Sequence, residues 1–577
     1  MYRATSPQSS FFEPIILCPD FLPSDDWSFI YRDKIWPLLD ENKFKHLHAA
    51  EGGAPNLSIK VKLSILIFMS METLTWRAAE NMFPRRLDWL HATCSPIGTK
   101  GIDHTTLFDF YNRLSEDTST KQLFYDLTHT FIDELGISIK KQRTDSFFTH
   151  GWLATLSRYG LFKETIRSFL LNLRKHQSDL YEGIKKTLSY DYLKESFDLT
   201  EKDKHQAQVR IQSMAQELYR LKAAFENHEV VKTYQSFKTL VTVFEQQCDI
   251  KDELSTRDKT AVVNTNSGNP PDTIHSESGT TGIEHSEPQI PDIQIKEKPT
   301  GDQIISTPHN LGATYTRKRK QKVVGHKSFV TETCDPDNPV QMVTDVNLEA
   351  ATHSDANEII PIIERLADNQ LGAKIMHGDA GFVNGESILM AAGESVSLEG
   401  PSAGRSQSIE GFEKADRALD IADFKVNVET KADMPEVIAC PKGQSPIKQE
   451  ISDYNWSYQY RFDHESCTAC ELAKRCPVKI GKRVATLTFT EAQLAGSQRH
   501  HRYMSDSSYR KECAVRSGAE SLVNEIANSH GARKSKHRTE KRTRLQLTFS
   551  AIGCNVKRYI NHMARSVQTS ALAPKTV

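Results

Sequence analysis

Residues 371–390, Leu-Gly-Ala-Lys-Ile-Met-His-Gly-Asp-Ala-Gly-Phe-Val-Asn-Gly-Glu-Ser-Ile-Leu-Met, decide how the chain is organised. A short apolar run ends in His377 and Asp379, a glycine-bearing turn follows, and Asn384 then precedes helical periodicity. This order predicts a strand, a turn and a helix, with Asp379 at the carboxyl tip of the strand. Ligands and metals gather at such tips in α/β sheets, so Asp379 is a candidate metal ligand. An aspartate that only caps the following helix would give the same local pattern.

The segments on either side predict the other strands of a sheet. Residues 136–148 alternate loosely and suit a strand that carries Asp145. Residues 323–333 and 340–346 suit two further strands, which a proline-containing turn separates. Residues 396–398 suit a short last strand. The sequence therefore predicts four strands around the central stretch.

One helix is expected between the strand at 340–346 and the strand before Asp379. Ser354 is its expected N-cap, Pro361 must kink or restart it, and Gly372 is expected to end it. The resulting order is strand, long insertion, two strands, helix, strand, helix and strand. With the insertion removed, this order matches the ribonuclease-H-like plan, an α/β fold in which helices flank a mixed sheet. Asp145 and Asp379 would then lie on neighbouring strands.

A helix near the C-terminus offers a third carboxylate. Its apolar stripe, within residues 507–528, consists of Ala519, Leu522, Val523 and Ile526. Glu520 and Glu525 lie on opposite borders of this stripe at 100° per residue, about equally far from its centre. Periodicity alone therefore does not choose between them.

Helical patterns also flank the predicted sheet. Residues 1–56 look irregular, whereas residues 57–114 predict short helices with Asp103 or Thr105 as an N-cap. These helices suit a helix-turn-helix domain or any small helical bundle. Helical spacing cannot distinguish these two alternatives. Residues 158–250 are helical, with an apolar stripe typical of a core.

The remaining compositional signals limit the class of protein. The chain has 577 residues and a net charge of -1, which excludes a uniformly basic nucleic-acid binder. No apolar run reaches the roughly 18 residues of a membrane span, and the N-terminus lacks a signal pattern. The 10 cysteines are too sparse for a disulfide scaffold, so we expect a cytoplasmic protein with reduced thiols.

Four cysteines cluster within residues 401–500, namely Cys440, Cys467, Cys470 and Cys476. The spacing Cys467-x-x-Cys470 is typical of two ligands to one metal ion in a zinc knuckle. Clustered thiols in a reducing compartment suggest one structural zinc ion. Four unliganded thiols remain the alternative. The other six cysteines are scattered and are expected to be core residues.

Basic residues concentrate in two short segments. The first contains Arg533, Lys534, Lys536, Arg538, Lys541, Arg542 and Arg544, with only Glu540 opposing them. The second contains Arg317, Lys318, Arg319 and Lys320. A charge run is usually a solvated surface, but these two adjoin the predicted catalytic elements, where they suit contacts with DNA phosphates.

Several motifs follow one another in the order of an insertion-sequence DDE transposase: Asp145 in Arg-Thr-Asp-Ser, Gly325-His326-Lys327, Asp379 in Gly-Asp-Ala-Gly-Phe, and Arg516-x-x-x-Glu520. The chain resembles the bacterial subgroup with a helical N-terminal domain and a cysteine-bearing insertion before the final glutamate. The resemblance covers residues 57–560 apart from the linker, and is most specific in 315–385 and 544–559. Cys513 and Ala527 depart from it, because related transposases often have Tyr and Lys there; Arg533 or Lys534 could supply a cation nearby.

The resemblance implies an enzyme that binds the terminal inverted repeats of its own element and cuts and joins DNA. Asp145, Asp379 and Glu520 would hold two divalent ions, Mg²⁺ or Mn²⁺, with Arg516 and the basic segments on double-stranded DNA. Pairing two transposon ends implies a homodimer or larger assembly, in the bacterial cytoplasm and on the nucleoid when DNA-bound. The alternatives are a nuclease of the same fold and a non-catalytic DNA-binding protein derived from a transposase.

These patterns divide the chain into an N-terminal region with a helical DNA-binding domain (1–130), the first catalytic strand (131–160), a helical insertion (161–250), a disordered linker or surface insertion (251–312), a ribonuclease-H-like catalytic core (313–400), the cysteine-containing insertion (401–500), the glutamate helix with a basic segment (501–565) and a tail (566–577).

Overall fold

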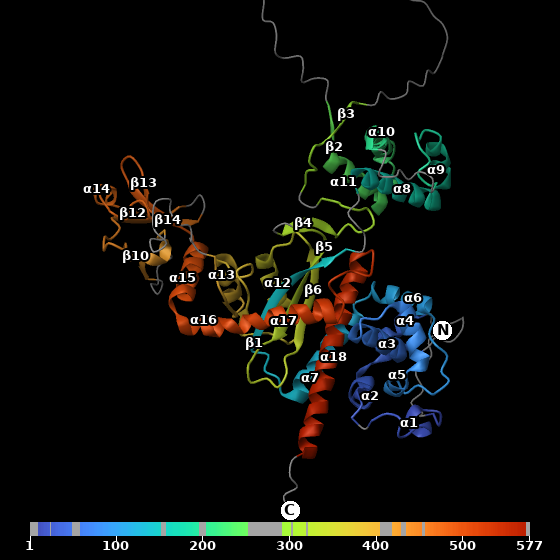
Figure 1. Ribbon diagram of the computed structural model, residues 1–577. Helices are drawn as coiled ribbons and strands as arrows, with labels where there is room; N and C mark the ends of the chain where they lie inside the picture. Colours follow the sequence, from blue (N-terminus) through green and yellow to red (C-terminus); the bar gives the residue numbers. More distant parts are fainter. Residues whose placement is uncertain are drawn as a thin grey trace, which may run out of the picture. The chain divides into compact units, whose positions relative to one another are not determined.

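The chain forms two compact units, Met1–Trp152 with Gly325–Val577 and Leu153–Val324 (Figure 1). The computed structural model describes residues 10–23, 25–48, 58–151, 157–194, 204–251, 291–301, 304–318, 321–403, 418–427, 434–452 and 456–572. Within this part of the chain, no helix is long and apolar enough to cross a membrane.

A six-stranded mixed sheet carries the two aspartates singled out above. Its strands, in spatial order, are β4 (Thr314–Lys318), β5 (Gln321–Thr333), β1 (Lys141–His150), β7 (Ile375–His377) and β8 (Ser397–Glu399), with β6 (Val343–Ala350) also paired to β5. β5 runs antiparallel to β1 and β6, whereas β1, β7 and β8 are parallel. The four predicted strands and the strand before Asp379 are confirmed, with ends shifted by a few residues.

The register places the two aspartates at equivalent positions of neighbouring strands. Arg143 and His377 form the last pair between β1 and β7. Asp145 lies two residues beyond Arg143, and Asp379 lies two residues beyond His377. Since side chains alternate along a strand, Asp145 points to the same face as Arg143. The expectation that the aspartates belong to neighbouring strands is confirmed.

Helices pack on this sheet. They are α12 (Asp355–Asp368) and α18 (Glu540–Leu572) against β6, α17 (Gly518–Asn524) against β1 and α13 (Gly385–Gly393) against β8 (Figure 1). Asn384 caps α13, as expected. α17 follows α16 (Ser507–Cys513) and a short 3₁₀ turn and continues into a π turn, Glu525–Ser529. The expected apolar stripe faces inward, because Ala519, Leu522 and Ile526 are buried.

For α12, one of the two alternatives expected at Pro361 is excluded, and the expected end of the helix is wrong. Pro361 lies inside one continuous helix and does not restart it. The carbonyl that loses its partner belongs to Asn357, which is exposed, so water can satisfy it. The helix also ends before Gly372, because Gln370 adopts a left-handed φ of 56° and the Leu371 N–H bonds back to the Leu366 carbonyl.

The N-terminal part of the first unit is helical. Its helices are α1 (Pro14–Leu17), α2 (Trp27–Ile30), α3 (Ile59–Met71), α4 (Trp76–Met82), α5 (Leu87–Ala92), α6 (His104–Leu114) and α7 (Ser119–Leu135). Asp103 caps α6, as expected. The expectation that residues 1–56 are irregular is wrong for α1 and α2, which Figure 1 shows beside the other N-terminal helices. α3 is buried on nearly all sides and packs against α18, which joins these helices to the sheet's core.

The cysteine-bearing insertion has its own small core. It contains β9 (Lys425–Asn427), β10 (Glu436–Ala439), β11 (Lys448–Ser452), β12 (Ser457–Phe462), α14 (His464–Thr468), β13 (Lys479–Ile480) and β14 (Ala485–Phe489). Stacked rings of Tyr460 and Phe489 lie at the centre of this core. α15 (Glu491–Ser505) follows and crosses α13 closely, because a β-carbon at Gly385 would overlap the backbone carbonyl of Ala492.

Replacement of Gly385 by Ala is therefore expected to disturb the attachment of the insertion to the six-stranded sheet. Overpacking against backbone costs about 1–3 kcal/mol or more. Gly393→Ala is the matched control, since Gly393 lies on the same helix and a β-carbon there has nothing within 4 Å. We expect faster proteolysis between residues 400 and 500 in Gly385→Ala and unchanged proteolysis in Gly393→Ala. Equal proteolysis of both variants would contradict the close crossing.

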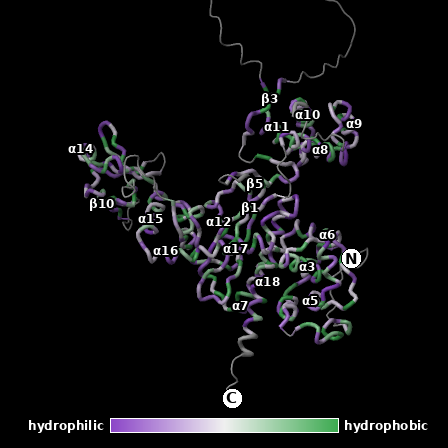
Figure 2. Tube along the Cα trace, in the orientation of Figure 1, coloured by the Kyte–Doolittle hydropathy of each residue, from purple (hydrophilic) through white to green (hydrophobic). Residues whose placement is uncertain are grey.

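The second unit is largely helical. Its elements are α8 (Arg158–His176), α9 (Ser178–Lys185), α10 (Lys204–Phe225), α11 (Gln235–Gln247), β2 (Cys248–Ile250) and β3 (Ile293–Ile295), besides β4. Apolar and polar positions alternate along the helices (Figure 2), and the apolar positions form a separate core. The prediction of a linker over 251–312 is wrong for its last part, because β3 pairs with β2 and Ile305 is buried in this core. Residues 252–290 lie outside the described residues.

Candidate active site

Asp145 and Asp379 form the centre of the candidate site. Burial raises the pKa of Asp145 to about 6, the nearby carboxylates of Asp379 and Asp355 add to this, and a hydrogen bond from the Ser146 N–H and the charge of Arg516 oppose it. Asp379 accepts a hydrogen bond from the Gly381 N–H at 2.8 Å, which holds the turn after β7. Acidic groups this close disfavour one another's ionised form, and a bound cation would relieve that repulsion. Hard carboxylate oxygens are also the donors that Mg²⁺ prefers, so these residues fit a divalent ion.

Asp355 is a member of this group that sequence analysis missed. It begins α12, and its carboxylate accepts a hydrogen bond from the Ser146 hydroxyl at 2.7 Å. An acidic residue in the first turn of a helix is common for electrostatic reasons alone, so the sequence carries no signal that separates the two roles. The hydrogen bond from Ser146, the neighbour of Asp145 on β1, holds it beside Asp145.

Glu520 lies on the helix that packs against β1, but its carboxylate is exposed. Within the described residues it has no hydrogen bond or ion pair. Arg143 fixes the start of α17, since its guanidinium donates to the Val515 carbonyl at 2.8 Å and occupies the space where a β-carbon at Gly518 would lie. The structure thus brings the two aspartates together, holds α17 against their strand, and leaves Glu520 on the solvent side of that helix.

Glu525, in contrast, forms an ion pair that connects elements of the fold. Arg558 of α18 reaches it at 2.7 Å and also reaches Glu332 on β5 at 2.7 Å, while Arg143 pairs with Glu332 at 2.6 Å. Burial alone would raise the pKa of Glu525, but hydrogen bonds from His530 and Arg558 outweigh it and lower the pKa to about 2. The carboxylate is therefore committed to a buried ion-pair network between α17, α18 and the sheet.

Two further titratable residues, Asp345 on β6 and His377 on β7, lie in the same sheet. Asp345 is buried and pairs with Arg365 at 2.8 Å and with the Tyr125 hydroxyl at 3.1 Å. It therefore supports α12 and α7 and does not join Asp145. His377 is buried at the end of β7, and burial lowers its pKa. A neutral imidazole there suits a packed residue beside the site.

The predicted basic segment after α17 lies along the end of β1. The Arg533 carbonyl accepts from the His150 N–H at 2.9 Å, and the Arg533 guanidinium lies over the Phe147 ring, 5.3 Å from its centroid. Phe147 is two residues from Asp145, so Arg533 points to the same face of β1. Arg533 thus occupies the neighbourhood in which a cation was expected.

The seven basic residues of that segment are not equally available to DNA. Lys541 pairs with Glu116, Arg544 pairs with Glu540 and Asn347, and Lys536 donates to the Leu74 carbonyl at 3.2 Å. The Arg542 guanidinium lies over the Phe108 ring. Lys534 and Arg538 are exposed. In the other segment Arg317 is exposed on β4 and Lys318 ends that strand, while Arg319 and Lys320 lie outside the described residues.

The four clustered cysteines come together in the small insertion. Burial raises the pKa of the Cys467 thiol, and the neighbouring thiols of Cys476, Cys440 and Cys470 raise it further. The Gln444 N–H donates to the Cys440 sulfur at 3.4 Å, a geometry that suits a thiolate turn. Of the described residues, three groups have all their ligand atoms within 4.8 Å of one another, and these cysteines are not among them. The thiols are therefore gathered, but lie farther apart than ligands on one ion.

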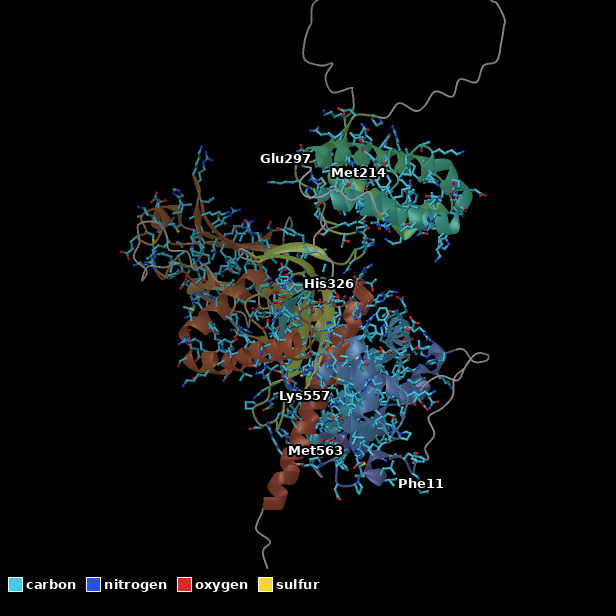
Figure 3. All side chains as sticks on the ribbon, turned by 45° about the vertical axis from the view of Figure 1, so that its right-hand side comes forward. Phe11, Met214, Glu297, His326, Lys557 and Met563 are labelled. Atoms are coloured by element: carbon cyan, nitrogen blue, oxygen red, sulfur yellow. The ribbon has the colours of Figure 1, made fainter. Side chains whose placement is uncertain are left out.

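β5 is the strand that pairs with β1 on the side away from β7. His326 (Figure 3) is fully buried there, and burial lowers its pKa to about 4. Gly325 has a φ of 159°, and a β-carbon on it would overlap the carbonyl of Thr149 on β1. The Gly325-His326 pair thus allows close pairing of β5 with the strand that carries Asp145.

A family model described as a transposase DDE domain matches residues 439–560. The matched segment contains the four clustered cysteines, Arg516, Glu520 and the basic segment. Asp145 and Asp379 both precede it and lie outside the match. Comparison with curated proteins and with solved structures gives no match.

Proposed function

We propose that the chain is a DDE transposase, which binds the terminal inverted repeats of its own insertion sequence and catalyses metal-dependent DNA cleavage and strand transfer. The observation that carries this proposal is the meeting of Asp145 and Asp379 at equivalent positions of two parallel strands. The strand order β6-β5-β1-β7-β8, with β5 antiparallel, supports a ribonuclease-H-like core.

The proposed chemistry is in-line displacement at phosphorus. An attacking oxygen forms a new bond to phosphorus while the bond to the leaving oxygen breaks, first with water and then with the freed 3′-hydroxyl. Two divalent ions, Mg²⁺ or Mn²⁺, would supply charge stabilisation for both oxygens. Asp145 and Asp379 would hold them, and Glu520 would complete the carboxylate set.

The positions of the cations suit DNA on the face of β1 that carries Asp145. The charge of Arg516 lowers the pKa of Asp145, and the Arg533 guanidinium lies over the ring of Phe147, two residues from Asp145 on β1. Lys534 and Arg538 are exposed nearby in sequence and would contact phosphates, which gives affinity without base specificity. The helical N-terminal domain would supply recognition of the transposon ends, and pairing of two ends would require a homodimer or larger assembly.

Incubation of the protein with DNA that carries the flanks of its gene tests this function. We expect nicks at the element ends and strand-transfer products with Mg²⁺, and neither product with EDTA. Nicks without joined products would favour the nuclease alternative. Binding of the flanks without any cut would favour the non-catalytic alternative.

A structural zinc ion on Cys440, Cys467, Cys470 and Cys476 is a second part of the proposal. The four thiols lie near one another, and they would have to approach further to hold one ion in a closed tetrahedral site. We expect about one zinc per purified chain by elemental analysis, and loss of this zinc in Cys470→Ser. Cys94→Ser is the control, because Cys94 lies in the N-terminal helical region. Metal-free wild-type protein would contradict the zinc assignment.

A further inference from the structure

Asp355 is held in a fixed orientation by two donors. Lys327 on β5 reaches its Oδ1 at 3.0 Å, and the Ser146 hydroxyl donates to the same oxygen at 2.7 Å. Ser146 adjoins Asp145 in β1, and its own N–H donates to the Asp145 carboxylate at 2.7 Å. One hydrogen-bonded chain therefore links Lys327, Asp355 and Asp145.

The second oxygen of Asp355 lies beside the turn that holds the other aspartate. A β-carbon built on Gly381 would lie 3.0 Å from Asp355 Oδ2 and 3.0 Å from Asp379 Oδ1. The two carboxylate oxygens therefore flank the same glycine. Lys327 and Ser146 both bond to Oδ1, and Oδ2 is the oxygen that lies next to Gly381.

Lys327 is itself a rigid support. Its ammonium donates to the His353 carbonyl at 2.9 Å and lies 5.9 Å and 5.7 Å from the ring centroids of Phe148 and Phe329. Its side chain is only 12% exposed, so it is poorly placed to contact DNA directly. A lysine enclosed in this way instead fixes the carboxylate that it meets.

We propose that Asp355 is a fourth carboxylate of the candidate site and a positioning residue for its divalent cations, oriented by Lys327 and Ser146. This inference rests on the proposed function. Oδ2 adds negative charge beside Asp379 and Asp145, and so strengthens their hold on a divalent cation without having to be a direct ligand. Groups that orient metal ligands in this way typically contribute 10- to 100-fold to metal affinity.

Mn²⁺ binding to the full-length protein without DNA, followed by electron paramagnetic resonance, tests this role separately from activity. We expect the dissociation constant to rise about 10- to 100-fold in Asp355→Asn. Glu364→Gln is the control, because Glu364 lies exposed on the same helix, and it is expected to bind Mn²⁺ like the wild type. Asp355→Ser serves as a second neutral variant, since serine suits the first turn of a helix.

The outcomes separate this inference from the function on which it rests. If Asp355→Asn and Asp355→Ser only lower the thermal midpoint of the metal-free protein and bind Mn²⁺ like the wild type, Asp355 is a helix-start residue and the inference is overturned. Asp379→Asn provides the reference in that case, because it must lose Mn²⁺ binding. If Asp379→Asn also binds like the wild type, the proposed metal site fails, and this inference fails with it.

Discussion

Replacement of Glu520 by Gln is expected to reduce Mg²⁺-dependent DNA cleavage at least about 100-fold while leaving stability unchanged. A carboxylate that helps to hold a catalytic cation contributes several kcal/mol to transition-state stabilisation, and about 2.7 kcal/mol corresponds to 100-fold in rate. Glu520 is exposed, and surface substitutions without partners change stability by about 0.5 kcal/mol or less. Cleavage rates and urea midpoints of the same preparation measure both effects.

Glu525→Gln is the matched comparison, because it removes the other carboxylate that borders the same apolar stripe. Its hydrogen bonds to Arg558 make a loss of about 1.5–3 kcal/mol expected at neutral pH. The folded-state pKa of about 2 lies below the usual glutamate pKa, so this stabilisation is present above about pH 4.5 and disappears as the pH falls toward 2. The destabilisation should therefore shrink at pH 3. Loss of cleavage in a stable Glu525→Gln, with active Glu520→Gln, would reverse the assignment.

Replacement of Glu332 by Gln is expected to cost about 3–5 kcal/mol of stability, because it removes the buried carboxylate that two partly buried arginines share. Glu332 is 1% exposed and bridges Arg143 on β1 and Arg558 on α18. Arg143 in turn fixes the start of α17 through the Val515 carbonyl. The loss should therefore loosen α17 as well as the sheet.

Urea unfolding followed by tryptophan fluorescence measures this effect, since Trp27, Trp76 and Trp89 pack in or against the core of the first unit. Glu364→Gln is the control for removal of one negative charge from the same unit. A midpoint of Glu332→Gln equal to that of the control would show that the network contributes no net stability.

The positions of Asp145 and Asp379 were predictable because both depend on local patterns. An apolar run that ends in an acidic residue before a helix start marks a strand tip, and the order of elements then fixes which strands are neighbours. The register of β1 and β7 confirms that inference. The capping residues Asp103 and Asn384 were likewise visible, because caps act within three residues of themselves.

The choice between Glu520 and Glu525 required contacts from far along the chain. Arg558, which pairs with Glu525, lies 33 residues later in α18, and no local sequence pattern indicates that pairing. Asp355 was missed for a related reason, since its neighbours Lys327, Ser146 and Gly381 come from three different segments. The end of α12 was misplaced because Gln370, and not a glycine, adopts the left-handed conformation.

The most direct test of the central claim is cleavage of DNA that carries the gene's own flanks, with Mg²⁺, by the wild type and by Asp379→Asn. Asp368→Asn is the control, because Asp368 is an exposed aspartate on α12 away from the site. The account predicts that the wild type and the control cut, and that Asp379→Asn is at least about 100-fold slower with an unchanged urea midpoint. Cleavage by Asp379→Asn at the wild-type rate would contradict the claim that the turn after β7 holds the catalytic metal.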